Sequence, residues 1–254
     1  MPTIVHLTDL HFERFPANLP AALKLVGDEP VDLFLVGGDN GGYEGIRATV
    51  DSLRQRWADV PIAWVMGNHD LWRQSYTHLW GTSDDVPATY LEGGNLDLEY
   101  ATVVGTYGHY DYSGRDPSIP LICFENYAFS NLRWNDRFID RCGRRDPEIA
   151  SEIAERFRLR YRAAIARRLP IVVLMHTCPF APEEPLRRSF VSGYCVNSKI
   201  GDVLASEERL PSVLFWGHTH RRSESDAHGF PMVNPGSDYT KVAIARYRLG
   251  GTGC

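Results

Sequence analysis

Residues 62–70 read Ile-Ala-Trp-Val-Met-Gly-Asn-His-Asp, an apolar run that stops abruptly at polar residues. Short, continuous apolar runs of this kind are typical of strands buried on both faces. Four other stretches repeat the pattern: 3–7 before Asp9 and His11, 33–36 before Asp39, 171–175 before His176, and 213–216 before His218 and His220. The chain therefore predicts a buried sheet that carries polar side chains at the carboxyl ends of its strands, where α/β proteins bind ligands.

Helical patterns lie between some of these runs. Residues 43–57 place Ile46, Val50, Leu53 and Trp57 at helical spacing. A longer helix is expected from Asp146, interpreted as an N-cap before Pro147, with apolar residues every fourth position up to Leu169. Pro170 then ends the helix directly before the strand at 171, which makes an αβ unit.

Three further segments suggest a mixed sheet. Residues 101–104 and 121–124 are candidate strands, and 242–248 alternate as a half-exposed strand would. The segment 107–145 is rich in aromatic and charged residues and has weak periodicity. We interpret it as a loop or cap inserted into a single domain that spans 1–254.

The composition narrows the class of partner. The chain has 254 residues, 43% of them hydrophobic, and a net charge of -5, which does not favour a dedicated duplex-DNA binder. Its five cysteines are widely spaced, without a CxxC pair, as in reduced proteins. No signal peptide or membrane span is visible, so a cytoplasmic location without a membrane partner is the expectation.

The polar residues at the strand ends suit metal ions. In extended segments, Asp9 and His11 would point the same way, as would His218 and His220. Carboxylate oxygens and imidazole nitrogens favour Mn, Fe or Zn. With only Asp39 placed to bridge, the number of donors argues for two ions, and Cys178 is a weaker additional candidate. The candidate ligands are Asp9, His11, Asp39, Asn68, His176, His218 and His220.

Each of these residues also has a simpler explanation when it is considered alone. Asp39-Asn40-Gly41 could be an ordinary turn, Asn68 a helix cap, and His176 a core histidine. What favours the metal site is their joint occurrence after five apolar runs.

Five motifs of the chain resemble, in composition and in order, those of the calcineurin-like metallophosphoesterase family. They are Asp9-Leu10-His11, Gly38-Asp39, Gly67-Asn68-His69-Asp70, His176 and Gly217-His218-Thr219-His220. The resemblance implies a four-layer α/β-β-α sandwich with mixed sheets. It also implies one metal on Asp9, His11, Asp39 and His220, and a second on Asp39, Asn68, His176 and His218.

The resemblance also implies a reaction. Two ions about 4 Å apart would lower the pKa of a shared water, and the bridging hydroxide would attack phosphorus. His69 is the candidate general acid for the leaving group. Asp70 either orients His69 or makes a structural contact, and both interpretations stay open.

The candidate substrate contacts are Asn40, Arg73 and His109. His109 lies in the aromatic cluster 107–112, which could line the substrate mouth or simply pack. Residues 38–44 lack the arginine of the GDxVDRG pattern of protein phosphatases in this family. We therefore expect hydrolysis of a small phosphomonoester or phosphodiester, nucleotides included. The alternatives are a single-strand nuclease and a non-catalytic scaffold that binds metal.

Overall fold

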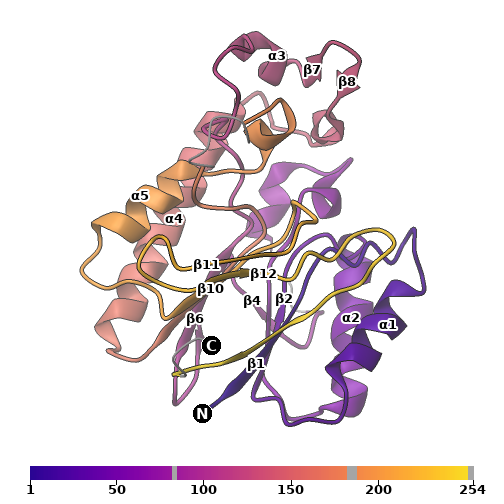
Figure 1. The fold of residues 1–254 in the computed structure, drawn as a ribbon, viewed down its shortest axis with the longest axis vertical. Helices are drawn as coiled ribbons and strands as arrows, with labels where there is room; N and C mark the ends of the chain where they lie inside the picture. The colour runs from indigo at the N-terminus through magenta and orange to yellow at the C-terminus, as the bar shows by residue number, and fades with distance from the viewer. Residues whose placement is uncertain (82–84, 182–187, 251–254) are drawn as a thin grey trace.

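Two mixed sheets form the centre of the fold in the computed structural model, which describes residues 1–81, 85–181 and 188–250 (Figure 1). The first sheet has the strand order β13-β1-β2-β3-β4, and the second has the order β11-β12-β10-β9-β6-β5. The strands are β1 (Thr3–Leu7), β2 (Leu33–Val36), β3 (Ile62–Trp64), β4 (Thr89–Tyr90), β5 (Leu96–Asp97), β6 (Thr102–Thr106), β7 (Ala128–Phe129), β8 (Leu132–Arg133), β9 (Ile171–Met175), β10 (Val213–Phe215), β11 (Ser223–Ser225), β12 (Met232–Asn234) and β13 (Ala245–Arg248).

The helices are α1 (Asn18–Val26), α2 (Gly42–Arg56), α3 (Leu121–Glu125), α4 (Asp146–Ala166) and α5 (Ser198–Ser206), with short 3₁₀ turns η1 (His69–Leu71), η2 (Tyr76–Trp80), η3 (Asn135–Phe138) and η5 (Val191–Tyr194). The strands β1 to β4 run parallel, as do β6, β9, β10 and β12. The antiparallel strands β13, β11 and β5 lie at the edges, so the predicted mixed sheet is confirmed.

The core explains why the strands are apolar on both faces. Ile4 and Leu35 of the first sheet belong to one buried cluster with Val172 and Leu174 of the second, so this cluster fills the space between the sheets. The alternate residues, such as Phe34, pack outward against helices. Helices α1 and α2 cover one sheet, and α4 and α5 cover the other (Figure 1). The result is the predicted four-layer sandwich.

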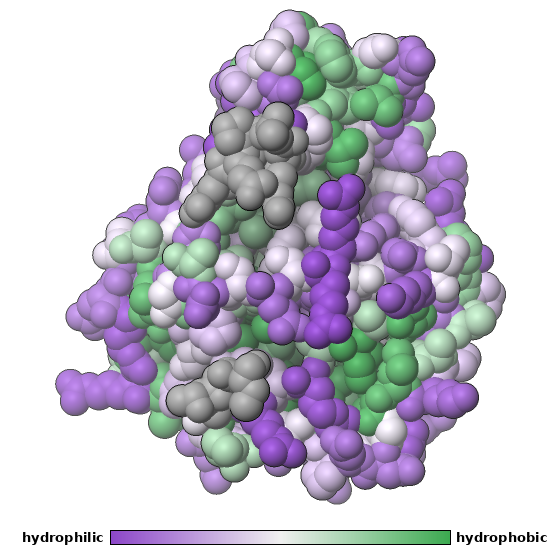
Figure 2. Space-filling model, in the orientation of Figure 1, coloured by the Kyte–Doolittle hydropathy of each residue, from purple (hydrophilic) through white to green (hydrophobic). Residues whose placement is uncertain are grey.

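Two local predictions are wrong. Residues 121–124 form the helix α3 and not a strand, because Leu121 and Ile122 face outward and only Phe124 is buried. Apolar residues gather on the surface over α3, β7 and β8 (Figure 2). Such short apolar runs do not distinguish the two structures. In α4, Arg145 and not Asp146 is the N-cap, since Asp146 turns inward as a buried acceptor.

The segment 107–145 carries α3, β7, β8 and η3, which extend beyond the two large sheets (Figure 1). Its interpretation as an insertion in a single domain stays a prediction. Among the helices of the described ranges, none is long and apolar enough to cross a membrane.

Candidate metal centre

The candidate ligands converge where the sheets present their strand ends, but they do so through strained loops. Asp9, His11, Asp39, His218 and His220 all have positive φ, between 44° and 66°. Our expectation of extended segments was therefore wrong, because each of these residues adopts the left-handed region. Non-glycine residues there cost about 1–3 kcal/mol each and cluster at functional sites.

Glycines beside these residues allow the loops to approach closely. A Cβ on Gly38 would lie 2.1 Å from the Gly67 nitrogen, and a Cβ on Gly67 would lie 2.1 Å from Asp39 Oδ1. The absence of a side chain at Gly67 lets the Asp39 carboxylate lie against the backbone.

The first donor cluster contains Asn68, His176 and His218. Asn68 Oδ1 lies 3.0 Å from His176 Nε2 and 2.9 Å from His218 Nδ1. The two imidazole nitrogens are 3.1 Å apart. An octahedral ion with bonds of about 2.1 Å places neighbouring donors about 3.0 Å apart. This triangle therefore has the size of a metal-binding face.

The second cluster contains Asp9, His11 and His220. His220 Nε2 lies 3.2 Å from His11 Nε2 and 3.5 Å from Asp9 Oδ1. Asp39 lies between the two clusters. Its Oδ2 is 3.5 Å from His176 Nε2 and 3.9 Å from His11 Nε2, while its Oδ1 accepts the His69 backbone N–H at 2.8 Å. One oxygen is thus held by the backbone and the other faces both clusters.

Outer hydrogen bonds orient the donors. The Nε2 of His218 lies 3.1 Å from the carbonyl oxygen of Tyr194. A carbonyl only accepts, so this nitrogen carries the proton and Nδ1 presents its lone pair to the cluster. The Asp9 carboxylate accepts the His218 backbone N–H at 2.9 Å and the Thr8 hydroxyl at 2.9 Å.

The charges also fit metal ions. Burial lowers the pKa of His11 and of His218 to about 3, and it lowers the pKa of His176 as well. These imidazoles are neutral at pH 7, which is the form that binds a metal. For Asp39, burial and the nearby carboxylates of Asp70 and Asp9 raise the pKa, a cost that a cation would remove. The residues present therefore suit first-row metal ions.

His69 and Asp70 have different surroundings. The His69 ring stacks on Trp72 at 3.7 Å, and its Nε2 lies 3.8 Å from Asp39 Oδ2. Asp70 Oδ2 accepts the backbone N–H groups of Asp39 and Gly67, each at 2.8 Å. Asp70 Oδ1 accepts the Gly42 N–H at 2.8 Å. Of the two interpretations left open, these bonds favour the structural one.

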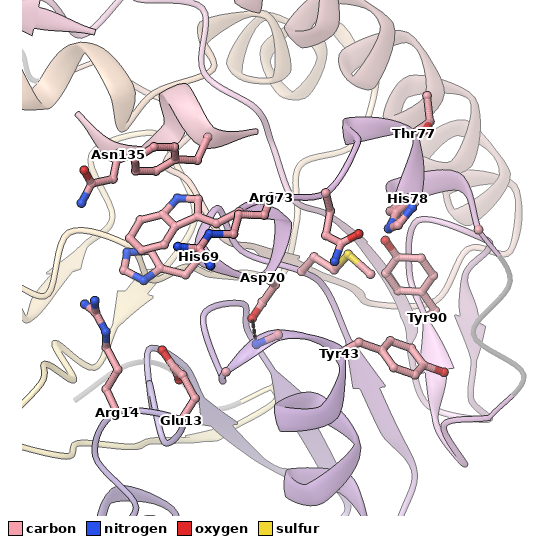
Figure 3. Close-up of a pocket in the computed structure, with 17 residues that line it drawn as sticks. Glu13, Arg14, Tyr43, His69, Asp70, Arg73, Thr77, His78, Tyr90 and Asn135 are labelled. Carbon is pink, nitrogen blue, oxygen red and sulfur yellow. Dashed lines mark hydrogen bonds between the residues drawn. The ribbon is translucent and has the colours of Figure 1, made fainter. Parts of the chain in front are cut away.

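A cavity of about 860 Å³ adjoins this centre on the His69 side. Glu13, Arg14 and Arg73 surround His69 at one end, and Tyr43, Tyr90 and His78 line the other end (Figure 3). The cavity therefore includes His69, and none of the seven candidate ligands is among the residues that line it.

The candidate substrate contacts are only partly brought together. Arg73 lines the cavity, at a strained φ of 64°. His109 is fully buried, and its Nε2 pairs with Asp146 Oδ1 at 2.6 Å, so it packs in the core of the segment 107–145. Asn40 is also buried and donates to the Gly37 carbonyl. Neither residue is among those that line the cavity. Cys178 is outside the donor clusters found among the described residues.

Sequence reasoning missed three residues of the site. Trp72 stacks on His69, Tyr239 lies with its ring 4.6 Å from that of His11, and Asp136 accepts from Asn68 Nδ2 at 2.8 Å. Trp72 follows the Asn-His-Asp motif closely, and this proximity was a usable signal. Asp136 and Tyr239 lie far from every motif, so only the folded chain reveals them.

A double sheet that carries buried carboxylates and imidazoles at its strand ends defines a candidate metal-binding protein of the α/β-β-α sandwich class. Residues 2–222 match the calcineurin-like phosphoesterase family model. The chain belongs to this family, whose members are metal-dependent phosphoester hydrolases.

Solved structures show the same fold. A phosphopantetheinyl hydrolase from Mycobacterium tuberculosis superposes with a TM-score of 0.67 and 24% identity, over 92% of this chain and 88% of that one. A candidate 5'-nucleotidase from Staphylococcus aureus superposes with a TM-score of 0.54 and 14% identity, over 96% of this chain and 50% of that one. No curated protein sequence matched the chain.

Proposed function

We propose that this chain hydrolyses an organic phosphoester with two metal ions that share Asp39. The observation that carries the proposal is the position of Asp39 Oδ2, which faces His11 in one donor cluster and His176 in the other. A carboxylate in this position is suited to bridge two ions. The first ion would be held by Asp9, His11, Asp39 and His220, and the second by Asp39, Asn68, His176 and His218.

The bound ions, with Mn, Fe or Zn preferred by these donors, would supply an activated water and neutralise the charge of the phosphate oxygens. The chain's own contribution is geometric. Burial and outer hydrogen bonds hold the donors in place before the substrate arrives, so little reorganisation is needed.

His69 is suited to protonate the leaving oxygen. Its ring is fixed against Trp72, and it lies between the donor clusters and the cavity. Burial and the neighbouring imidazoles of His11 and His218 lower the pKa of His69 to about 2. A bound phosphate ester would add negative charge beside the ring and favour its protonated form.

The cavity is suited to hold the leaving group, because it opens from His69. Its volume accommodates an organic group of appreciable size. Arg14 and Arg73 add positive charge at the end nearest His69, while Tyr43 and Tyr90 offer aromatic rings further away (Figure 3). The proteins named above as a phosphopantetheinyl hydrolase and a candidate nucleotidase agree with a small, organic phosphoester as substrate.

The test is a substrate panel on protein stripped of metal and then loaded with Mn. The panel contains p-nitrophenyl phosphate, bis(p-nitrophenyl) phosphate, mononucleotides, cyclic nucleotides and a single-stranded oligonucleotide. Mn-dependent release from a small ester supports the proposal. Cleavage of the oligonucleotide alone would favour a nuclease, and metal binding without any hydrolysis would favour a scaffold.

A further inference from the structure

Asp136 is a buried carboxylate in η3, within the segment 107–145. Its Oδ1 accepts from Asn68 Nδ2 and from Trp72 Nε1, each at 2.8 Å. Its Oδ2 accepts from Trp134 Nε1 at 2.8 Å. These donors are all neutral N–H groups. A buried carboxylate held in this way is costly, which suggests that its charge serves a purpose.

The bond to Asn68 determines which way the amide points. An ionised carboxylate only accepts, so the end of the amide that faces Asp136 has to be the NH₂ group. The amide oxygen then faces His176 and His218, at 3.0 and 2.9 Å. Turned by 180°, the amide would present donor hydrogens to a metal. Asp136 therefore selects the orientation in which Asn68 can be a ligand.

The two indoles extend this arrangement to the rest of the centre. Trp72 donates to Asp136 and stacks on His69. Trp134 also donates to Asp136 and stacks on Tyr194 at 4.9 Å, and the Tyr194 carbonyl accepts from His218 Nε2. The Asp136 carboxylate thus contacts Asn68 directly, and it is connected to His69 through Trp72 and to His218 through Trp134 and Tyr194.

We propose that Asp136 is a positioning residue for the metal ligand Asn68, and that the segment 107–145 is through it a working part of the metal centre. This inference rests on the proposed function. It goes beyond that function because it makes metal binding depend on a residue far from every ligand motif. Its neighbours Asn135 and Phe138 line the cavity, so the same short helix contacts both the metal centre and the leaving-group side.

The test is the binding of Mn to Asp136→Asn, measured by calorimetry and by electron paramagnetic resonance. With the new amide oxygen on the Asn68 side, its NH₂ group would face the indole N–H of Trp134, two donors in contact. The orienting bond is then weakened. We expect the ion of the cluster with Asn68, His176 and His218 to bind about 10- to 100-fold more weakly, the range for loss of an outer partner of a metal ligand. The other ion should keep its affinity, so the spectrum changes from a coupled pair to a single ion.

A second variant tests the mechanism. In Asp136→Asn/Trp134→Phe the opposing indole N–H is gone, and the new amide can accept from Asn68 and Trp72 without conflict. We expect the double variant to regain most of the lost affinity. Asp140→Asn, an exposed carboxylate of the same segment, is the matched control and should bind both ions normally.

Unchanged binding of both ions by Asp136→Asn would overturn the inference, and so would an equal weakening of both ions. Absence of rescue in the double variant would overturn the proposed donor conflict. Failure of the proposed function looks different, because the unmodified protein itself would then bind fewer than two ions or hydrolyse no ester.

Discussion

The carboxylate of Asp70 accepts the backbone N–H of Asp39 at 2.8 Å, which ties the loop after β3 to the loop after β2. The same carboxylate also accepts from Gly67 and Gly42. It is fully engaged by the backbone and does not contact the His69 ring by a hydrogen bond. The last residue of the Asn-His-Asp motif therefore stabilises the position of the central carboxylate.

Replacement of Asp70 by Asn should damage metal binding and stability together. One end of the new amide is a donor and would oppose a backbone N–H, at a cost of about 1–3 kcal/mol. We expect a lower free energy of unfolding and weaker Mn binding, measured by denaturation and calorimetry. Asp51→Asn, a surface carboxylate of α2, is the control. If the variant bound metal normally but its hydrolysis rate depended differently on the leaving group, Asp70 would instead orient His69.

Asp39→Asn should remove both ions, whereas His218→Ala should weaken chiefly the cluster that contains Asn68. The reason is that Asp39 Oδ2 faces both clusters and His218 only one. Metal content and hydrolysis of p-nitrophenyl phosphate should fall together in Asp39→Asn, by more than about 100-fold in rate, because a direct ligand contributes more than an outer partner. Retention of two ions would contradict the shared role of Asp39.

Much of the fold could be predicted because its strands are buried on both faces. The run 171–175 becomes β9 at the predicted residues, and 33–36 becomes β2. The prediction failed at 121–124, where a short apolar run lies on the surface of α3 and no local periodicity distinguishes strand from helix.

The candidate ligands could be predicted from their motifs, but their surroundings could not. Asp9 and His11 converge through left-handed residues, a conformation that no spacing rule indicates. Asp136 contacts Asn68 across 68 positions of sequence. Its neighbours in the chain carry no motif, and such a contact exists only after the chain has folded.

The His69→Ala variant should bind both ions but hydrolyse phosphoesters more slowly. Proton transfer by a positioned side chain contributes about 10²–10⁴-fold, and the contribution is largest for poor leaving groups. We expect a severe loss on alkyl phosphates and a mild loss on p-nitrophenyl phosphate, in steady-state rates at fixed Mn. Since His69 Nε2 is near Asp39 Oδ2, metal content has to be measured in parallel. Loss of an ion in the variant would show that His69 is a ligand. Full activity of the variant on an alkyl ester would contradict the role of His69 as a general acid.

Arg73→Ala should weaken binding of substrates that reach into the cavity. Arg73 lines that cavity beside His69 (Figure 3). A hydrogen bond to a charged group contributes about 1.5–3 kcal/mol, so KM should rise about 10- to 100-fold with little change in kcat. Arg222→Ala is the matched control, since Arg222 Nη2 is bound to Glu224 Oε1 at 2.8 Å. An equal effect of the two substitutions would argue against a specific contact by Arg73.

Acid should destabilise the metal-free protein, in part through His6. This imidazole lies between the sheets against Phe215, and neither ring nitrogen has a partner among the described residues. Burial lowers the pKa of His6 from 6.5 to about 3. Between these two values the unfolded chain carries a proton on His6 that the folded chain lacks. Stability is therefore lost as the pH falls below about 6.5.

One such imidazole changes the free energy of unfolding by up to about 1.4 kcal/mol per pH unit over that interval. We expect His6→Leu to reduce the slope by about this amount, measured by urea unfolding between pH 4.5 and 7.5 with a chelator present. His78→Leu, at an exposed position, should keep the slope of the parent. Equal slopes in the parent and His6→Leu would show that the buried imidazole takes up its proton without unfolding. The acid sensitivity would then arise at the ligand histidines, whose slope should persist when Mn is added, because bound metal holds them in the neutral form while the unfolded chain still takes up their protons.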